Sequence, residues 1–320
     1  MKSIFSNNYY GLIIKKLRVK NKLTLSSLEK ITGVDTAAIS RLETGSQLPF
    51  EKYKLLFDYF NIDKNFIDKA ENELSYAFIQ FMQAIIDISP NVEKYYLNLQ
   101  NNFEEYKNSI FSFIFKLSDL IYSSFNHNYR IVNYQIILNN IDFLSDEYQS
   151  YAYMYVAECL TKQGDKNSAK QYYEQAQKKS NYSTQAKAFL SYFLSSYYLL
   201  INDYFQSLKH LENSSNLFLE LQNYNRLINL NIRKGNQLRH IHLFQKALKN
   251  DLSALINIEN YPHLDLEKYS LINNIGWTYL LMENYHCALK YIEMLPKEMK
   301  KCNHFFDQAI CYIMIQKDNE

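Results

Sequence analysis

The chain has 320 residues, of which 47% are apolar and 21% are charged, so it can bury an ordinary core and is not a disordered chain. Its 6 glycines and 4 prolines are too few for the many turns of a sandwich or a barrel, which favours a mostly helical protein. The formal net charge of +2 is uneven, because residues 1–66 hold 11 Lys/Arg and 6 Asp/Glu, a net of +5. Any surface that binds a polyanion is therefore expected at the amino-terminal end.

The four cysteines have no CxxC spacing, which indicates reduced, buried thiols in a cytoplasmic protein. No apolar targeting segment follows Met1-Lys2, and the longest uncharged stretch, Ala188–Ile201, is too short to span a bilayer. The seven histidines are dispersed, so neither a metal site nor a cofactor is expected.

The first predicted helices follow each other closely. Apolar positions in Tyr10–Arg18 share one face of a helix, with two lysines opposite. Thr24 is a good N-cap for a second helix, whose apolar positions are Leu25, Leu28 and Ile31.

A third and a fourth helix follow a break at Gly33. The third, Thr36–Thr44, is capped by Asp35 or Thr36, and Gly45 can supply the left-handed residue that ends it. The fourth, Phe50–Phe60, begins after Pro49. Short helices joined by a glycine-containing turn in a basic bundle are typical of a helix-turn-helix.

The segment Ile14–Pro49 reads IKKLRVKNKLTLSSLEKITGVDTAAISRLETGSQLP. It resembles the Xre/Cro/repressor helix-turn-helix family in many positions taken in order, over about the first 65 residues. The resemblance implies that the third helix enters the major groove of double-stranded DNA. It also implies an internal ion pair between Arg18 and Glu43, which would link the first helix to the end of the third.

The expected DNA contacts can be named residue by residue. Arg41 would bind guanine, Ala37 would meet a thymine methyl group, and the polar side chains nearby would position the domain on phosphates. The predicted DNA-binding residues are Thr24, Thr36, Ala37, Ser40, Arg41 and Thr44. A solvated surface arginine is the alternative interpretation of Arg41.

The rest of the chain contains internal repeats of helix pairs. Tyr153–Gln177 matches a tetratricopeptide unit, and weaker copies follow at Ser195–Ser214, Arg233–Ala254 and Asn274–Glu293. The small residues expected where paired helices approach most closely are Ala169, Ser207, Ala247 and Ala288. Residues Asn61–Asn72 are the predicted joint to the preceding domain, and His304–Gln316 a capping helix.

The predicted fold class is therefore all-α, with an amino-terminal helix-turn-helix bundle of five helices followed by a tetratricopeptide-like right-handed solenoid. The predicted domains are 1–66 for DNA binding, 67–148 for degenerate helical repeats and 149–320 for the repeats with their capping helix. This combination resembles the Rgg/PlcR/PrgX (RRNPP) group of peptide-responsive quorum-sensing regulators. The resemblance implies a cytoplasmic homodimer whose repeats hold a short signalling peptide and thereby control transcription.

The residues give a separate reason to expect a peptide. The inner surface of a stacked array is lined by positions two, five, nine and twelve of each first helix, and Asn side chains there can hold a peptide backbone. Arg239 could bind the carboxylate at the carboxyl end of the peptide. The predicted peptide-binding residues are Tyr192, Ser196, Asn229, Asn236, Arg239, Asn273 and Trp277.

Other interpretations stay open at this point. Asn is abundant along the whole chain, so Asn236 and Asn273 could equally be solvated, and Trp277 could belong to the core. A regulator whose repeats dock a protein partner is the alternative function. An enzyme is not expected, because no Walker loop, HExxH motif, nucleophile elbow or paired carboxylates with a nearby base occur in the sequence.

Overall fold

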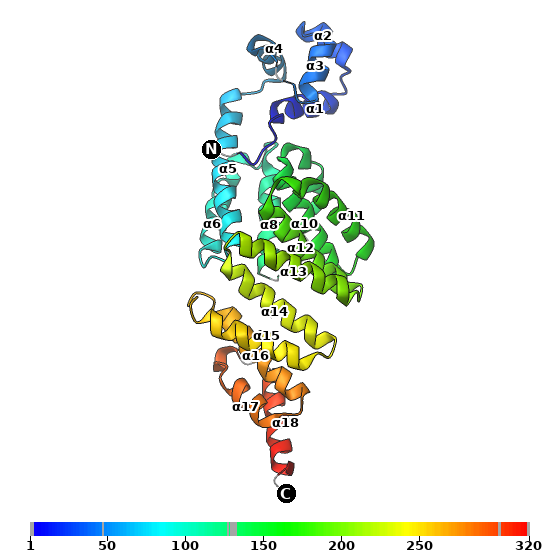
Figure 1. Cartoon of the computed structure of the whole chain (residues 1–320). Coiled ribbons are helices and arrows are strands. Elements are labelled where there is room, and N and C mark those ends of the chain that lie inside the picture. Colours follow the sequence, from blue (N-terminus) through cyan, green and yellow to red (C-terminus); the bar gives the residue numbers. More distant parts are fainter. Residues whose placement is uncertain (1–2, 47, 127, 129–132, 300–301, 319–320) are drawn as a thin grey trace. The chain divides into compact units, whose positions relative to one another are not determined.

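The computed structural model describes residues 3–46, 48–126, 128, 133–299 and 302–318. Within these residues every named element is a helix: eighteen α-helices and three short 3-10 helices. The chain divides into two compact units, one of residues 1–86 with 91–186 and the other of residues 87–90 with 187–320. The all-α fold class, with a helix-turn-helix head and a body of helical repeats, is confirmed (Figure 1).

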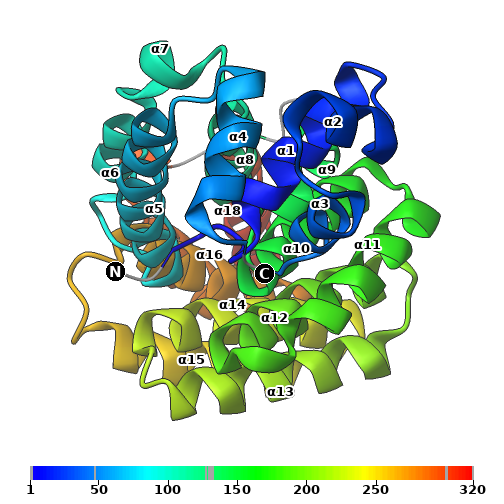
Figure 2. The same ribbon diagram turned by 90° about the horizontal axis from the view of Figure 1, so that it is seen from above.

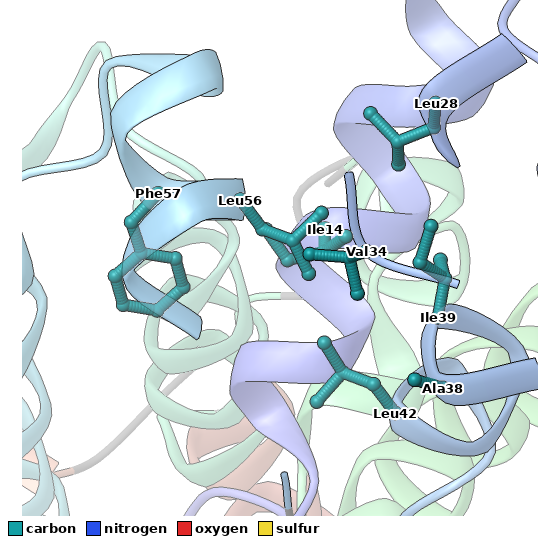
Figure 3. Close-up of a cluster of buried hydrophobic side chains, with 8 residues drawn as sticks. All are labelled: Ile14, Leu28, Val34, Ala38, Ile39, Leu42, Leu56 and Phe57. Atoms are coloured by element: carbon teal, nitrogen blue, oxygen red, sulfur yellow. The ribbon is translucent and has the colours of Figure 1, made fainter. Parts of the chain in front are cut away.

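The first four helices form the head of the first unit. They are α1 (Tyr9–Lys20), α2 (Leu25–Thr32), α3 (Thr36–Glu43) and α4 (Phe50–Phe60). All four helices contribute to one apolar core (Figure 3), whose buried residues are Ile14, Leu28, Val34, Ala38, Ile39, Leu42, Leu56 and Phe57. The four helices lie together in the view from above (Figure 2).

Local signals fix where α2 and α3 begin and end. The Thr24 hydroxyl accepts a hydrogen bond from Ser27 N at 3.0 Å, and the Ser27 hydroxyl accepts one from Thr24 N, which forms a capping box. Gly33 closes α2 with a φ of 72°, which few other residues adopt at no cost. Asp35 then caps α3 by accepting from Ala38 N at 2.7 Å.

One apolar position of α2 differs from the pattern. Ile31 is 52% exposed, although the periodicity predicts that it faces inward with Leu28. Helix α2 has only eight residues, and Leu28 is its buried residue. Ile31 therefore lies outside the apolar core to which Leu28 belongs.

The remaining helices of the first unit begin with α5, a helix of 23 residues directly after the head. They are α5 (Lys64–Ile86), α6 (Val92–Gln100), α7 (Phe103–Tyr106), α8 (Ser112–Phe125), α9 (Tyr134–Leu138), α10 (Asp146–Gln163) and α11 (Lys166–Lys179), with 3-10 helices at Ile141–Phe143 and Ser180–Tyr182. Helices α10 and α11 form the first repeat, in which Ala169 and Tyr173 are buried.

Residues 3–6 form an amino-terminal strap that joins the start of the head to the helices behind it. Phe5 and Leu144 make an isolated antiparallel β-bridge, with Ser6 N donating to Phe143 O at 2.8 Å and Ser145 N donating to Ile4 O at 2.9 Å. The Phe5 ring is 2% exposed and meets the Phe111 ring edge-on at 5.3 Å between centroids. The strap is therefore a packed part of the first unit.

The second unit contains the later repeats. Its helices are α12 (Thr184–Leu200, from residue 187 onward), α13 (Tyr204–Glu220), α14 (Tyr224–His240), α15 (Phe244–Ile258), α16 (Asp265–Leu281), α17 (Tyr285–Glu293) and α18 (Cys302–Asp318), with a 3-10 helix at Lys297–Met299. Ser207, Ala247 and Ala288, which the repeat pattern places at the closest approach of paired helices, are all 0% exposed. Within the first of these pairs, the Ser207 hydroxyl donates to Ser195 O at 2.6 Å, which ties α13 to α12.

The turns of the repeats share one conformation. The residue before the N-cap has a positive φ at Gly164, Asn202, Gln222, His242 and Glu283. In four of these five turns an Asp or Asn then caps the next helix through its side chain, namely Asp165, Asp203, Asn223 and Asn284. Asp and Asn side chains favour such caps because they accept from backbone N–H groups two or three residues later.

None of the described helices combines the length and the apolar content that crossing a bilayer would require.

Candidate DNA-binding face and repeat surface

Helix α3 presents one side to solvent and the other to the core of the head. Ala37, Arg41 and Thr44 are exposed, and Thr36 and Ser40 are partly exposed. The opposite side of the same helix, from Ala38 to Leu42, supplies three residues to the apolar core. All five predicted base-side and phosphate-side positions of this helix therefore lie on its accessible face.

Two of the predicted phosphate contacts already have local partners. The Thr44 hydroxyl donates to Ser40 O at 2.9 Å, and the Thr24 hydroxyl caps α2. Each hydroxyl keeps acceptor capacity but offers only one hydrogen, so a phosphate would compete with Ser40 O for Thr44. Within the described part of the chain, the Arg41 guanidinium makes a single long hydrogen bond, from Nε to Ala37 O of its own helix at 3.3 Å.

Arg18 and Glu43 join the first helix to the end of α3. Arg18 Nε lies 2.6 Å from Glu43 Oε1, and Arg18 Nη2 lies 2.7 Å from Glu43 Oε2, a two-pronged pair. The third branch of the guanidinium donates to Leu23 O at 2.9 Å. The hydrogen bond to Glu43 raises the pKa of Arg18, and the pair holds the exposed face of α3 in a fixed orientation.

A second ion pair of the head was not foreseen from the sequence. Lys52 Nζ, on α4, lies 2.7 Å from Asp35 Oδ2, while Asp35 Oδ1 caps α3. The Lys52 contact, followed by the bond from Ala38 N, lowers the pKa of Asp35. The ion pair thus connects the start of α3 to α4. In the sequence, the only signal for this pair is a lysine that follows an N-cap aspartate.

The predicted peptide-binding residues lie on α12, α14 and α16 of the second unit. A polar stripe runs along α14 and consists of Arg226, Asn229, Arg233 and Asn236, spaced by three, four and three residues. The Tyr192 hydroxyl of α12 donates to Asn229 Oδ1 at 2.8 Å. Beyond the stripe, near the carboxyl end of α14, Arg239 Nη1 donates to the Thr278 hydroxyl of α16 at 3.0 Å.

Arg226 and Arg233 are residues of this stripe that the sequence analysis missed. The Arg233 guanidinium stacks on the Tyr192 ring at 3.6 Å, and Arg233 Nη1 donates to the Ser196 hydroxyl at 2.5 Å. The Arg226 guanidinium lies over the Phe189 ring at 4.8 Å. Of the residues predicted on α14, Asn229 and Asn236 belong to the stripe, whereas Arg239 does not.

Arg239 corrects one prediction. Its side chain is 4% exposed and Nη1 lies 2.5 Å from Asp251 Oδ2, with Asp251 fully buried on α15. Its Nη2 also donates to Asn236 Oδ1. Arg239 is therefore engaged inside the helix packing, and this geometry does not support the role of binding a peptide carboxylate.

The other predicted residues differ in exposure. Tyr192 and Ser196 are nearly buried, at 6% and 9%, beneath the stripe. Asn229 and Asn273 are partly exposed, and Asn236 is exposed. Trp277 is 50% exposed, so it is a surface residue of α16 rather than part of the core.

No group of three or more His, Cys, Asp or Glu side chains that could hold a metal ion occurs among the residues that the structure describes.

The first four helices place the head in the helix-turn-helix class of DNA-binding domains. Residues 14–67 match the sequence profile of the Helix-turn-helix family. A search of curated protein sequences finds no significant match. Among solved structures, the chain is similar to PlcR of Bacillus thuringiensis, crystallised with the peptide PapR7 and DNA, at 14% sequence identity and a TM-score of 0.47. The alignment covers 81% of this chain and 99% of the PlcR chain.

Proposed function

We propose that this protein is a transcriptional regulator that binds operator DNA through α3 and responds to a short signalling peptide held on its repeats. In this proposal it acts in the cytoplasm, as a homodimer, in quorum sensing. The homodimer would present two copies of α3 to half-sites about one helical turn apart.

The exposed face of α3 is the observation that carries the DNA-binding half of the proposal. Arg41 is exposed and bound only weakly along its own helix, so its guanidinium is available for the two acceptors of a guanine edge. The two ion pairs at the ends of α3 support a rigid presentation of that face. Rigid presentation lowers the ordering cost of binding.

The polar stripe of α14 supports the peptide half. An extended peptide offers an N–H and a C=O at each residue, and a row of Asn and Arg side chains on neighbouring helices can pair with them. Asn229 and Asn236 lie seven residues apart on α14, about two helical turns, with Arg233 between them. The Trp277 ring, half exposed on α16, could provide an apolar contact for the same peptide.

The DNA-binding half is tested by selecting duplexes from a random-sequence library with the intact protein and titrating the winner in gel shifts. We expect Arg41→Ala to weaken binding by about 5- to 150-fold, which corresponds to roughly 1–3 kcal/mol. The matched control is Lys166→Ala, an exposed lysine on α11, which should leave the affinity unchanged. Unchanged affinity and salt dependence for Arg41→Ala, or no selected sequence at all, would contradict the proposal.

The peptide half is tested by calorimetry with peptides that the protein selects from a random library of short peptides. Asn236→Ala and Asn273→Ala should each weaken binding. If both variants bind as the unaltered chain does, the assignment of these residues fails.

A protein partner is the second candidate, and exposed apolar residues on the second helices of the repeats favour it. Phe205 is 75% exposed, Ile256 72% and Leu219 56%. Such side chains on α13 and α15 could meet a broad partner surface. Loss of binding to a captured partner in Phe205→Ser and Ile256→Ser, with no peptide selected, would favour this function over peptide sensing.

A further inference from the structure

We propose that Arg233 is the anion-binding residue of the repeat surface and that it recognises a carboxylate carried by the peptide ligand. This inference rests on the proposed function and specifies the chemical class of the ligand. It replaces Arg239, whose charge is already satisfied, by an arginine one and a half turns earlier on the same helix.

The guanidinium of Arg233 is held in place by two contacts with α12. Its plane stacks on the Tyr192 ring at 3.6 Å, and one of its N–H groups is used by the Ser196 hydroxyl at 2.5 Å. Both partners are nearly buried, so the surrounding packing restricts their side chains to one position. A guanidinium carries five N–H donors, and these two contacts leave an edge of the fork unused.

The charge of Arg233 has no acidic partner in the described part of the chain. Arg239 shows what a satisfied arginine looks like on this helix, because it is buried on Asp251. Arg233 is instead partly exposed, over a ring and beside a neutral hydroxyl.

Asn229 completes a site for a carboxylate at the end of, or along, a peptide. The Tyr192 hydroxyl donates to Asn229 Oδ1, and among the described residues the Asn229 amide N–H groups have no hydrogen-bond acceptor. Asn229 and Arg233 are four residues apart, so they share one face of α14. The planar fork of Arg233 matches the two oxygens of a carboxylate, and the amide can hold the adjoining peptide bond.

The carboxylate has two sources in a peptide, the carboxyl terminus and an Asp or Glu side chain. Three random libraries of short peptides separate them. The first has free carboxyl termini and no acidic residues, the second has amidated termini and includes Asp and Glu, and the third has amidated termini and no acidic residues. The full-length protein is incubated with each library, and the retained peptides are identified by mass spectrometry.

We expect retention from the first or the second library and none from the third. The library that is retained identifies the source of the carboxylate. For a retained peptide, Arg233→Gln should weaken binding about tenfold or more, and Arg233→Lys should weaken it less. Lys234→Gln removes a charge from the exposed neighbour on α14 and should leave binding unchanged.

The inference and the proposed function fail in different ways. Equal retention from all three libraries, with an unchanged affinity for Arg233→Gln, would overturn the carboxylate site and leave peptide sensing intact. Retention from none of the libraries would overturn both. The comparison of libraries uses the unaltered protein, so it decides the matter even if Arg233→Gln does not fold.

Discussion

Arg239 of α14 and Asp251 of α15 form an ion pair that is closed to solvent, with Nη1 and Oδ2 2.5 Å apart and side-chain exposures of 4% and 0%. The carboxylate is also bound by Asn250, whose Nδ2 donates to Asp251 Oδ1 at 3.0 Å. Burial of two charges is tolerated only when each finds partners, and here each has at least two. The pair therefore fixes how the two helices of this repeat pack.

Asp251→Ala should lower the free energy of unfolding by about 3–5 kcal/mol, because it leaves the buried Arg239 charge without its counter-ion. Urea denaturation measures this. The control is Glu259→Ala, which removes an ion pair with Lys268 in which Glu259 is 62% exposed, and it should cost at most about 1 kcal/mol. Equal effects of the two variants would show that the buried pair has no special weight.

Gly235 and Gly276 should respond differently to alanine. A Cβ at Gly235 would lie 2.0 Å from Asp251 Oδ1, so Gly235→Ala must displace the ion pair and should cost about 1–3 kcal/mol. A Cβ at Gly276 would meet Ile292 Cγ1 at 3.1 Å, which a flexible side chain can relieve. The gain in helix propensity of up to about 1 kcal/mol should then leave Gly276→Ala neutral or more stable. Thermal melts measure the stability of both variants. A Gly276→Ala variant less stable than Gly235→Ala would contradict the prediction.

Phe5→Ala should destabilise the first unit, because the ring of this residue fills a buried position against Phe111. The expected loss is about 3–5 kcal/mol, as for other large-to-small changes at aromatic core residues. Phe205→Ala, at a ring that is 75% exposed, serves as control and should change stability by less than about 0.5 kcal/mol. Chemical denaturation measures both variants. Equal free energies of unfolding for Phe5→Ala and Phe205→Ala would show that the strap does not stabilise the first unit.

His210 should make the second unit less stable in mild acid. Its ring stacks on the Tyr198 ring at 5.0 Å, and burial, with a smaller contribution from Lys209, lowers its pKa below the ordinary value of 6.5. The unfolded chain therefore takes up the proton first, so stability is full above pH 6.5 and declines as the pH falls below it toward the lowered pKa. The slope for one proton is at most about 1.4 kcal/mol per pH unit.

Unfolding titrations between pH 7.5 and pH 5, a range chosen around the ordinary pKa of histidine, would measure this decline. His210→Gln should flatten it. His286→Gln, at an exposed histidine on α17, should not. Equal slopes for the unaltered chain and His210→Gln would refute the assignment.

Much of the head could be predicted because its signals are local. Thr24, Gly33 and Asp35 each act on backbone groups within four residues, so the sequence around them is sufficient to place the ends of α2 and α3. The burial of Ala247 and Ala288 follows in the same way from a repeated spacing. Ile31 marks the limit of periodicity, because the pattern cannot tell how wide a face a short helix buries.

The details of the repeat surface could not be predicted from spacing alone. Arg239 and Asp251 are twelve residues apart on different helices. Whether Arg239 binds Asp251 or faces solvent depends on how α14 and α15 pack, which the spacing does not reveal. Arg233 was missed because the inner face of α14 is set by its contacts with Tyr192 and Ser196, which depend on the rotation of the helix. The strap was missed because its partners, near residues 111 and 144, are distant in sequence.

The amino-terminal strap also sets an order of events during synthesis. Phe5 leaves the ribosome long before Leu144, the residue with which it bridges, so the head exists for a time without its anchor. Domains made first generally fold first. Until Leu144 has been made, the Phe5 ring therefore lacks the β-bridge that ties it to the rest of the first unit.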